Sequence, residues 1–360
     1  MKVWHAAALA GVFSCALALN MSANAACDDN WKDCKGKSWV DGTAMETPLG
    51  SKWWPHPMWG AGDEAGSTNW YSKPDVVMRA MAMVKQGKAM KIGHDYEDGM
   101  PLFGARKFSL RIPGTPTGGP FGATRLMYND EFLSTEIGQV GTQFDGLGHI
   151  GVAIGDPQDK KAMRWYNGFT AAEMGSPYGL RKLGTEKLNP IIARGVLLDI
   201  AAARGVEAMR AGQVITMVDV KAALKKQGME GFKFMPGDAV IFRTGWEKHW
   251  IKDNATYNNG APGIGIEVAR WIAEEVKAGV TGADTWPVDA VCGKGTPCEV
   301  PKGCVFCVHA YLQTRHGIVN QENLKLSGLA GASVYRFAYI YTPVPIKGAT
   351  GSIGSPVAVW

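Results

Sequence analysis

The segment Gly195-Val-Leu-Leu-Asp-Ile200 is a short apolar run bounded by turn residues, which is typical of a buried β-strand. A helix is predicted over Thr216–Gln227, because Thr216 can cap its start, Asp219 stands three residues further on, and Gly228 can end it. Strand-like and helix-like segments continue to alternate after it, over residues 238–243, 266–277 and 280–285. This alternation predicts an α/β fold in which helices cross between the strands of one sheet.

The remaining segments predict smaller elements and one domain. Pro74 and Gly87 bracket a predicted helix over Asp75–Gln86. The Gly- and Pro-rich stretch Lys107–Arg125 is predicted to be a loop or hairpin with strands flanking it. The 360 residues are 46% hydrophobic and 20% charged, without a repeat or a long polar linker, so we expect a single globular domain over residues 58–360. An extended N-terminal arm over residues 26–57 is expected to precede it.

The first 25 residues have the pattern of a cleavable signal peptide. Lys2 gives a positive start, Ala6–Leu19 is an apolar core, and Ala23-Asn24-Ala25 is the small-x-small pattern before a cleavage site. A membrane anchor is the alternative, but it needs about 20 apolar residues and this run ends at Asn20. We therefore expect a periplasmic or secreted protein with no membrane partner.

Charge and cysteines narrow the class further. The net charge of +5 is spread without a basic cluster, which argues against nucleic acid and leaves a small-molecule substrate as the expected partner.

Cys15 would leave with the signal peptide, and six cysteines remain in an oxidising compartment. We expect local disulfides, Cys27 with Cys34 and two bridges within residues 292–307, although six cysteines allow 15 pairings. A metal or redox site at Cys304-x-x-Cys307 is the alternative.

One segment concentrates chemically useful side chains: Gln139-Val-Gly-Thr-Gln-Phe-Asp-Gly-Leu-Gly-His149. Asp145 and His149 are residue types that bind metals or move protons, and the glycines would let the backbone approach a ligand.

This segment resembles the cyclase family that contains kynurenine formamidase and isatin hydrolase, whose signature is His-x-Gly-Thr-His-x-Asp-x-x-x-His. Gly141, Thr142, Asp145 and His149 match it in register. Three further segments fit the same family in the same order, so the resemblance runs from about Trp59 to the C-terminus. They are Trp59-Gly-Ala-Gly-Asp-Glu-Ala-Gly-Ser-Thr-Asn69, Gly237-Asp-Ala-Val-Ile-Phe-Arg-Thr-Gly-Trp246 and Gly348-Ala-Thr-Gly-Ser352.

The resemblance implies a swivelling β/β/α domain, a mixed sheet with flanking helices, and a homodimer or higher homo-oligomer. Two histidines that ligate metal in the family are Gln139 and Gln143 here. A glutamine offers only a neutral amide oxygen, which puts a two-zinc site in doubt. What the resemblance leaves is a single site for Mn²⁺ or Zn²⁺, with Asp145, His309 and Glu322 as ligands and Gln143 completing the shell or binding through water.

The expected reaction is metal-dependent hydrolysis of a small cyclic or N-acyl amide, or of a lactone, with His149 as acid and base. Gln139 and Trp59 are expected to contact substrate, with contact to the metal as an equal alternative for Gln139. Each candidate has a structural alternative, such as a hydrogen-bonded core histidine or a turn-forming aspartate. The functional alternatives are a metal-free small-ligand-binding protein on the same fold and a polyketide-type cyclase or dehydratase.

Overall fold

The computed structural model describes residue 40 and residues 45–360. The predicted signal peptide, most of the N-terminal arm and the pair Cys27 and Cys34 lie outside these residues. In the described part, no helix is long and apolar enough to cross a membrane.

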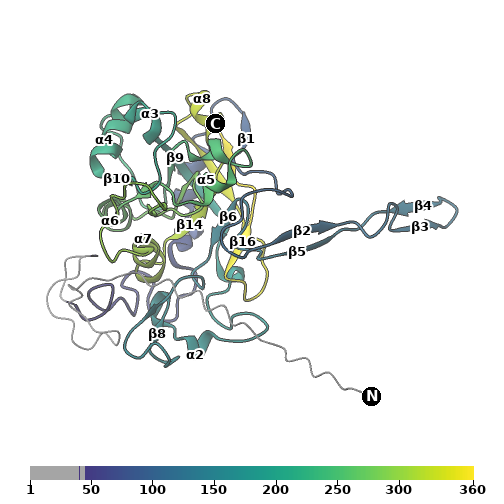
Figure 1. The fold of residues 1–360 in the computed structure, drawn as a ribbon, viewed down its shortest axis with the longest axis horizontal. Coiled ribbons are helices and arrows are strands. Elements are labelled where there is room, and N and C mark those ends of the chain that lie inside the picture. The colour runs from purple at the N-terminus through teal and green to yellow at the C-terminus, as the bar shows by residue number, and fades with distance from the viewer. Residues whose placement is uncertain (1–39, 41–44) are drawn as a thin grey trace, which may run out of the picture.

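A nine-stranded mixed sheet forms the centre of the molecule, and its strands β1, β6, β9, β14 and β16 are labelled in Figure 1. The strand order is β1-β17-β15-β9-β11-β13-β14-β6-β16. Its strands are β1 (Ala89–Lys91), β6 (Gln143–Asp145), β9 (Ile191–Asp199), β11 (Ala239–Arg243), β13 (Val280–Ala283), β14 (Val319–Glu322), β15 (Arg336–Tyr341), β16 (Gly351–Ile353) and β17 (Val357–Val359). The middle strands β9, β11, β13 and β14 are parallel, and the strands on both sides of them pair antiparallel.

The other elements are short. The helices are α1 (Pro74–Met81), α2 (Ala171–Met174), α3 (Ile200–Arg204), α4 (Met217–Lys226), α5 (Asn254–Asn258), α6 (Ile266–Arg270), α7 (Cys307–His309) and α8 (Ser327–Gly331). The small two-stranded sheets are β2 (Phe108–Arg111) with β5 (Phe132–Thr135), β3 (Gly118–Phe121) with β4 (Leu126–Tyr128), β7 (Val152–Ala153) with β8 (Met163–Arg164), and β10 (Val214–Ile215) with β12 (Gly263–Ile264).

Both faces of the sheet are buried, because successive side chains of a strand point to opposite faces. Val196 and Leu198 of β9 enter the core that also contains residues of α4 and α6. Leu197 enters the opposite core, which Val76 of α1 helps to cover. Two apolar layers around a mostly parallel centre are what the alternating sequence pattern predicts, and the α/β class with a mixed sheet and flanking helices is confirmed.

The predicted strands at β11 and β13 and the predicted helix at α4 are confirmed. Thr216 and Asp219 form the expected capping box at the start of α4. The strand predicted at Gly195 starts earlier, at Ile191, because residues 191–194 pair with β15. It ends at Asp199, whose side chain caps α3 by accepting from the backbone N–H of Ala202 (3.0 Å).

Two predicted helices differ from the structure: one is shorter than expected and the other is less regular. The helix predicted to reach Gln86 ends at Met81, because the backbone N–H groups of Gln86 and Lys88 donate to the carbonyl oxygen of Trp360 instead. The helix predicted over residues 266–277 is α-helical only to Arg270 and continues as a π-helical turn over Trp271–Val276. Lys277, the last residue of the predicted helix, has φ +55° and ends the helical segment.

The Gly- and Pro-rich stretch over residues 107–125 was expected to be a loop or hairpin with strands on its two sides. A hairpin is confirmed, but only two of its strands flank the stretch: β2 and β3 lie inside it, and β4 and β5, which pair with them, follow it directly. Together, residues 108–135 make a hairpin arm that projects from the body of the molecule (Figure 1). The composition showed the turns, whereas the short strands between them were too irregular to recognise.

The expected disulfides within residues 292–307 are confirmed as Cys292–Cys298 and Cys304–Cys307. Both sulfur atoms of the Cys304-x-x-Cys307 pair are therefore used in a bridge.

Candidate metal centre

Strand pairing gathers the acidic residues on one face of the sheet. In the antiparallel pair β6–β14, Gln143 lies opposite Glu322 and Asp145 lies opposite Asn320. Because side chains alternate along each strand, these four share one face, and Phe144 points to the opposite apolar core. All four are buried. Two carboxylates are thus held side by side away from solvent.

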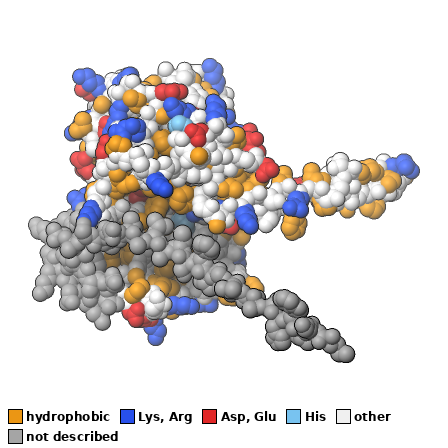
Figure 2. Space-filling view, in the orientation of Figure 1, with side chains coloured by type: hydrophobic (Ala, Val, Ile, Leu, Met, Phe, Trp, Pro, Cys, Tyr) orange, Lys and Arg blue, Asp and Glu red, His pale blue; other side chains and the backbone are white. Residues whose placement is uncertain are grey.

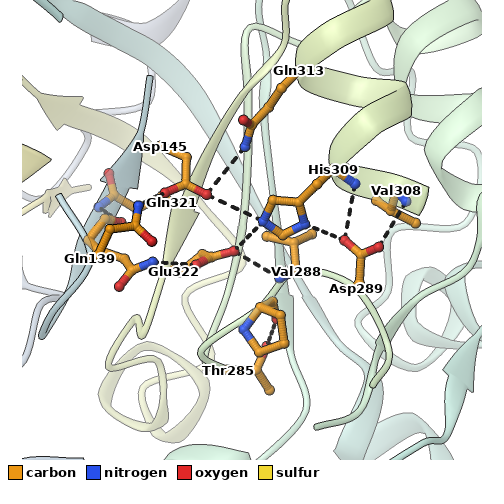
Figure 3. Close-up of polar contacts among 12 residues, drawn as sticks. Gln139, Asp145, Thr285, Val288, Asp289, Val308, His309, Gln313, Gln321 and Glu322 are labelled. Atoms are coloured by element: carbon orange, nitrogen blue, oxygen red, sulfur yellow. Dashed lines mark hydrogen bonds and ion pairs between the residues drawn. The ribbon is translucent and has the colours of Figure 1, made fainter. Parts of the chain in front are cut away.

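His309 completes this group from α7. Its Nε2 atom lies 2.9 Å from Oε1 of Glu322 and 3.3 Å from Oδ2 of Asp145 (Figure 3). One potential ligand atom from each of the three residues lies within 4.8 Å of the others. Residues separated by up to 177 positions of sequence therefore converge on one point.

Asp289 holds His309 from the other side. Its Oδ2 atom lies 2.5 Å from Nδ1 of His309, and its two oxygens accept the backbone N–H groups of Val308 (2.8 Å) and His309 (3.1 Å) (Figure 3). The ring orientation is therefore fixed, with Nε2 facing Asp145 and Glu322. A carboxylate behind a histidine is the arrangement that orients metal-ligating histidines and raises their basicity.

Three glutamines surround the carboxylates, and each points its amide nitrogen at one of them. Gln139 donates to Oδ1 of Asp145 (2.9 Å), Gln313 donates to Oδ2 of Asp145 (3.3 Å), and Gln143 donates to Oε2 of Glu322 (2.7 Å). Gln139 accepts in turn from Nη2 of Arg106 (2.9 Å), which fixes which end of its amide faces Asp145. The amide contacts of Gln139 are thus with Asp145 and Arg106; its contact with substrate stays a prediction.

Burial and like charge set the protonation of the group. Burial, together with the negative charge of Asp145, raises the pKa of Glu322 to about 7. Burial would lower the pKa of His309, but the charge of Asp289 and the hydrogen bonds to the acids raise it well above its usual value. Burial also opposes ionisation of Asp145, yet the charges of His149 and His309 hold its pKa below the usual value. Without a metal, the group therefore retains protons, with the His309 imidazolium between the acids.

His149 lies at the edge of this group. Burial lowers its pKa below the usual 6.5, against the opposing charge of Asp145, and the charges of His309 and Arg106 lower it further. A neutral imidazole near pH 7 can accept a proton, which the expected acid and base role requires. The turn that carries it is tight: a Cβ on Gly148 would meet the carbonyl oxygen of Leu183 at 2.9 Å. This glycine lets the backbone approach another segment of the chain rather than a ligand.

A row of aromatic rings leads from His309 toward the surface. Phe306 meets the His309 ring edge-on (centroids 5.6 Å apart), Trp286 meets Phe306 in the same way (6.1 Å), and Phe103 stacks on Trp286 (4.0 Å). Phe103 is 36% exposed, and the guanidinium of Arg106 lies 5.5 Å from its ring centre. The row therefore connects the buried acids with a partly exposed ring at the surface.

Trp59 lies elsewhere. Its ring meets Trp70 edge-on at 5.2 Å and stacks on His56 at 6.4 Å, and the ammonium of Lys73 lies over it. These contacts are not with the acidic group, so a substrate role for Trp59 stays a prediction.

The donor set fits a divalent cation. His309 offers a lone pair at Nε2 once its other ring nitrogen donates to Asp289, and the two carboxylates supply the charge that a buried dication needs. Among the described residues, Oε1 of Gln313 and both amide atoms of Asn320 are buried without a hydrogen-bond partner. Asn320 shares the sheet face of Asp145 and Glu322. Unpartnered oxygens beside the acids are further donors for an ion or its water.

Three residues of the site were not predicted from the sequence: Asp289, Gln313 and Arg106. Gln313 stands four residues after His309 in one helical segment, so helical spacing alone could have indicated it. Asp289 lies in a loop six residues after the end of strand β13, too far from the strand end for the strand pattern to indicate it. Arg106 carried no signal, because it reaches the group only through the base of the hairpin arm.

Comparison with known proteins gives one family. The family model described as "Putative cyclase" matches residues 90–290. No curated protein matches. A crystal structure described as a novel cyclase superposes with a TM-score of 0.70 at 27% identity, covering 84% of this chain and 96% of that one.

Isatin hydrolases share the fold at lower identity. Isatin hydrolase A from Ralstonia solanacearum gives a TM-score of 0.50 at 18% identity, covering 76% of this chain and 92% of that one. An isatin hydrolase bound to the product analogue thioisatinate gives 0.52 at 18%, covering 77% and 93%.

Proposed function

Since this chain belongs to the cyclase family, whose model matches more than half of it, we propose that it is a metal-dependent hydrolase that opens a small cyclic or N-acyl amide, or a lactone. The observation that carries the proposal is the buried convergence of Asp145, His309 and Glu322, with Asp289 behind the histidine. Isatin hydrolases share the fold, and the isatin in their names is a small ring of this kind.

Each residue has a part in this reaction. A divalent ion, when bound, supplies a lowered pKa for a water molecule and polarisation of a carbonyl group. Asp145, Glu322 and Nε2 of His309 would hold it, with Mn²⁺ and Zn²⁺ as the candidates. Gln143 donates its amide N–H to Glu322 in the metal-free site, and its amide would have to turn over to offer the oxygen as a fourth ligand. Asp289 keeps the proton of His309 on Nδ1, so that Nε2 stays free to ligate.

The remaining groups handle the proton and the substrate. His149 accepts the proton of the attacking water at a ring nitrogen and returns it to the leaving nitrogen or oxygen as the carbonyl–heteroatom bond breaks. The rings of Phe306, Trp286 and Phe103 bind the flat part of the substrate and exclude water from the acids. Arg106 and Gln139 orient Asp145.

One observation favours a second candidate, a metal-free protein that binds a small ligand. The amides of Gln139, Gln143 and Gln313 already satisfy carboxylate oxygens without a cation. Such a protein would keep His309 protonated between the acids and would take up no ion.

A hydrolysis assay with metal removal separates the two. The mature chain is stripped with a chelator and assayed on an isatin-type cyclic amide, an N-formyl arylamine and an aryl lactone, with and without Mn²⁺ or Zn²⁺. The hydrolase proposal predicts product only with metal, and none in the Asp145→Asn variant. Binding of these compounds without turnover and without metal uptake would favour the second candidate. We also propose export through the N-terminal signal, which N-terminal sequencing of the secreted chain tests.

A further inference from the structure

A cleft of about 450 Å³ lies at the opposite end of the parallel strands from the candidate metal centre. Ala278 and Ile318 line it and stand just before the first residues of β13 and β14, whereas Glu322 is the last residue of β14. The step from Ile318 to Glu322 covers about 13 Å of extended strand. On the face drawn in Figure 2, exposed apolar side chains gather along the hairpin arm, and no described residue of that arm lines the cleft. The cleft is therefore separate from both the arm and the metal centre.

Two tryptophans form one wall of the cleft. The rings of Trp59 and Trp70 meet edge-on with their centroids 5.2 Å apart, and both residues line the cleft. The ring of His56, another lining residue, is nearly parallel to that of Trp59, with centroids 6.4 Å apart. Pockets for small molecules measure roughly 300–1,000 Å³ and are lined mainly by apolar and aromatic groups. The size and the rings of this cleft therefore suit a small molecule with a flat ring.

The two histidines of the cleft are neutral near pH 7. Burial, together with the charge of Arg315, lowers the pKa of His316 to about 3. Burial also lowers the pKa of His56, whose Nδ1 accepts the backbone N–H of Trp59 (3.2 Å). Nε2 of His316 is buried, and it has no hydrogen-bond partner in the part of the chain that the structure describes. A neutral imidazole with an unused nitrogen can form one hydrogen bond with a polar atom of a ligand.

One cation and one anion stand at the rim of the cleft. Lys277 and Glu274 are exposed, and both line it. The carbonyl oxygen of Lys277 accepts the backbone N–H of Gly237 (3.0 Å), which fixes the position of this residue at the end of its helical segment. Oε1 of Glu274 accepts the hydroxyl of Tyr311, so its other oxygen can accept from a ligand. The rim thus offers a partner to a carboxylate and a partner to an amino group.

We propose that this cleft is a second small-molecule site, which binds an aromatic amino acid or another flat-ringed molecule with both an amino group and a carboxylate. The ring packs on Trp59 and Trp70, and its N–H or O–H group donates to Nε2 of His316. The carboxylate pairs with Lys277, and the amino group donates to Glu274. Opposite charges at the rim select such a molecule over a simple acid or amine, because each charged group of the ligand then meets its complement.

Isothermal titration calorimetry of the full mature chain tests the proposal with three probes that share one ring. L-Tryptophan carries both charged groups, indole-3-propionate lacks the amino group, and tryptamine lacks the carboxylate. We expect L-tryptophan to bind about 3–10-fold more tightly than either of the other two, the range for a charge pair at a solvent-exposed rim. The measurement records binding alone, so its outcome is independent of the proposed hydrolysis.

Two variants assign the charged groups. Lys277→Met should weaken L-tryptophan and indole-3-propionate about 3–10-fold and leave tryptamine unchanged. Glu274→Gln should weaken L-tryptophan and tryptamine by a similar factor and leave indole-3-propionate unchanged. The matched control is Lys161→Ala, at an exposed loop position, which should bind all three probes like the wild type.

Two further variants locate the ring. His316→Phe keeps a ring beside Tyr311 but removes the acceptor nitrogen, so it should weaken all three probes several-fold. Asp145→Asn, in the metal centre, should bind L-tryptophan like the wild type. The proposal is overturned if no probe binds, if Asp145→Asn abolishes binding, or if Lys277→Met weakens tryptamine as much as L-tryptophan.

Discussion

The carboxylate of Asp289 lies 2.5 Å from Nδ1 of His309 and accepts the backbone N–H of the same residue. One acid thus fixes both the position of the helix end and the orientation of the imidazole. The opposite ring nitrogen is left facing Asp145 and Glu322. The expected consequences of this arrangement can be measured one residue at a time.

Asp289→Asn should reduce the affinity for Mn²⁺ or Zn²⁺ by about 10–100-fold while the fold is kept, because an amide can accept one hydrogen bond but cannot raise the basicity of His309. Chelator competition measures the affinity. Asp159→Asn, at an exposed loop, is the control and should bind like the wild type. Equal affinities in all three proteins would show that Asp289 does not support a ligand.

Glu322→Gln should make the metal-free protein less sensitive to pH and abolish its stabilisation by metal. In the folded protein the pKa of Glu322 is raised to about 7, so between its unfolded value of 4.5 and 7 the folded state binds more protons than the unfolded state. The contribution of this group to stability therefore falls as pH rises through that window, by up to about 3 kcal/mol. The glutamine variant lacks this loss, and chemical denaturation of both proteins at several pH values measures the difference.

The affinity for metal should rise with pH. Both Glu322, with its pKa raised to about 7, and His309, with its pKa raised well above the usual value, must release a proton before they can ligate. Below pH 7 a larger fraction of both groups is protonated, so the affinity for metal should drop at least ~10-fold per pH unit. Affinity that stays flat between about one unit below and one unit above that pH would contradict proton displacement at this group.

His149→Ala should lower hydrolysis by about 10²–10⁴-fold and leave metal content unchanged, because this residue moves protons and lies outside the set of ligands. Burial lowers the pKa of His149, so in the presence of saturating metal its protonation should reduce wild-type activity only below pH 6.5. The control is His249→Asn, at a partly exposed position that packs on Trp246. Undiminished activity in the alanine variant would remove His149 from the mechanism.

Replacing both cysteines of the 304–307 bridge with serine should weaken metal binding as well as stability. This bridge ends two residues before His309, and the 292–298 bridge begins three residues after Asp289, so the two brace the segment between them. We expect a loss of about 2 kcal/mol in the free energy of unfolding, with a several-fold weaker metal affinity. Thermal unfolding with and without metal measures both effects, and a loss of stability alone would show that the bridge does not position His309.

Local chemistry in the sequence was sufficient for the regular elements. Caps and apolar runs identified α4, β11 and β13, and short spacing identified the two described disulfides. Long-range contacts altered the rest: pairing with Trp360 shortened α1, and β15 lengthened β9. A hairpin was expected over residues 107–125, but the strands inside that stretch were not, because they have no core to face and lack the periodicity that reveals a strand.

The candidate site divides in the same way. The resemblance to the family indicated three of its residues, Asp145, His309 and Glu322. Only the folded backbone brings Asp289 and Arg106 to them. The orientation of the glutamine amides also depends on their partners, since Gln139 is turned by Arg106 and Gln143 faces its cross-strand neighbour Glu322.

The most direct test is anomalous scattering from crystals of the mature chain soaked with Mn²⁺ or Zn²⁺. We expect one peak within ligand distance of Asp145 Oδ2, His309 Nε2 and Glu322 Oε1, with the Nδ1 contact of His309 to Asp289 retained. A metal-loaded crystal with no peak there, or with the ion held by other residues, would contradict the assignment of these three side chains as a metal centre.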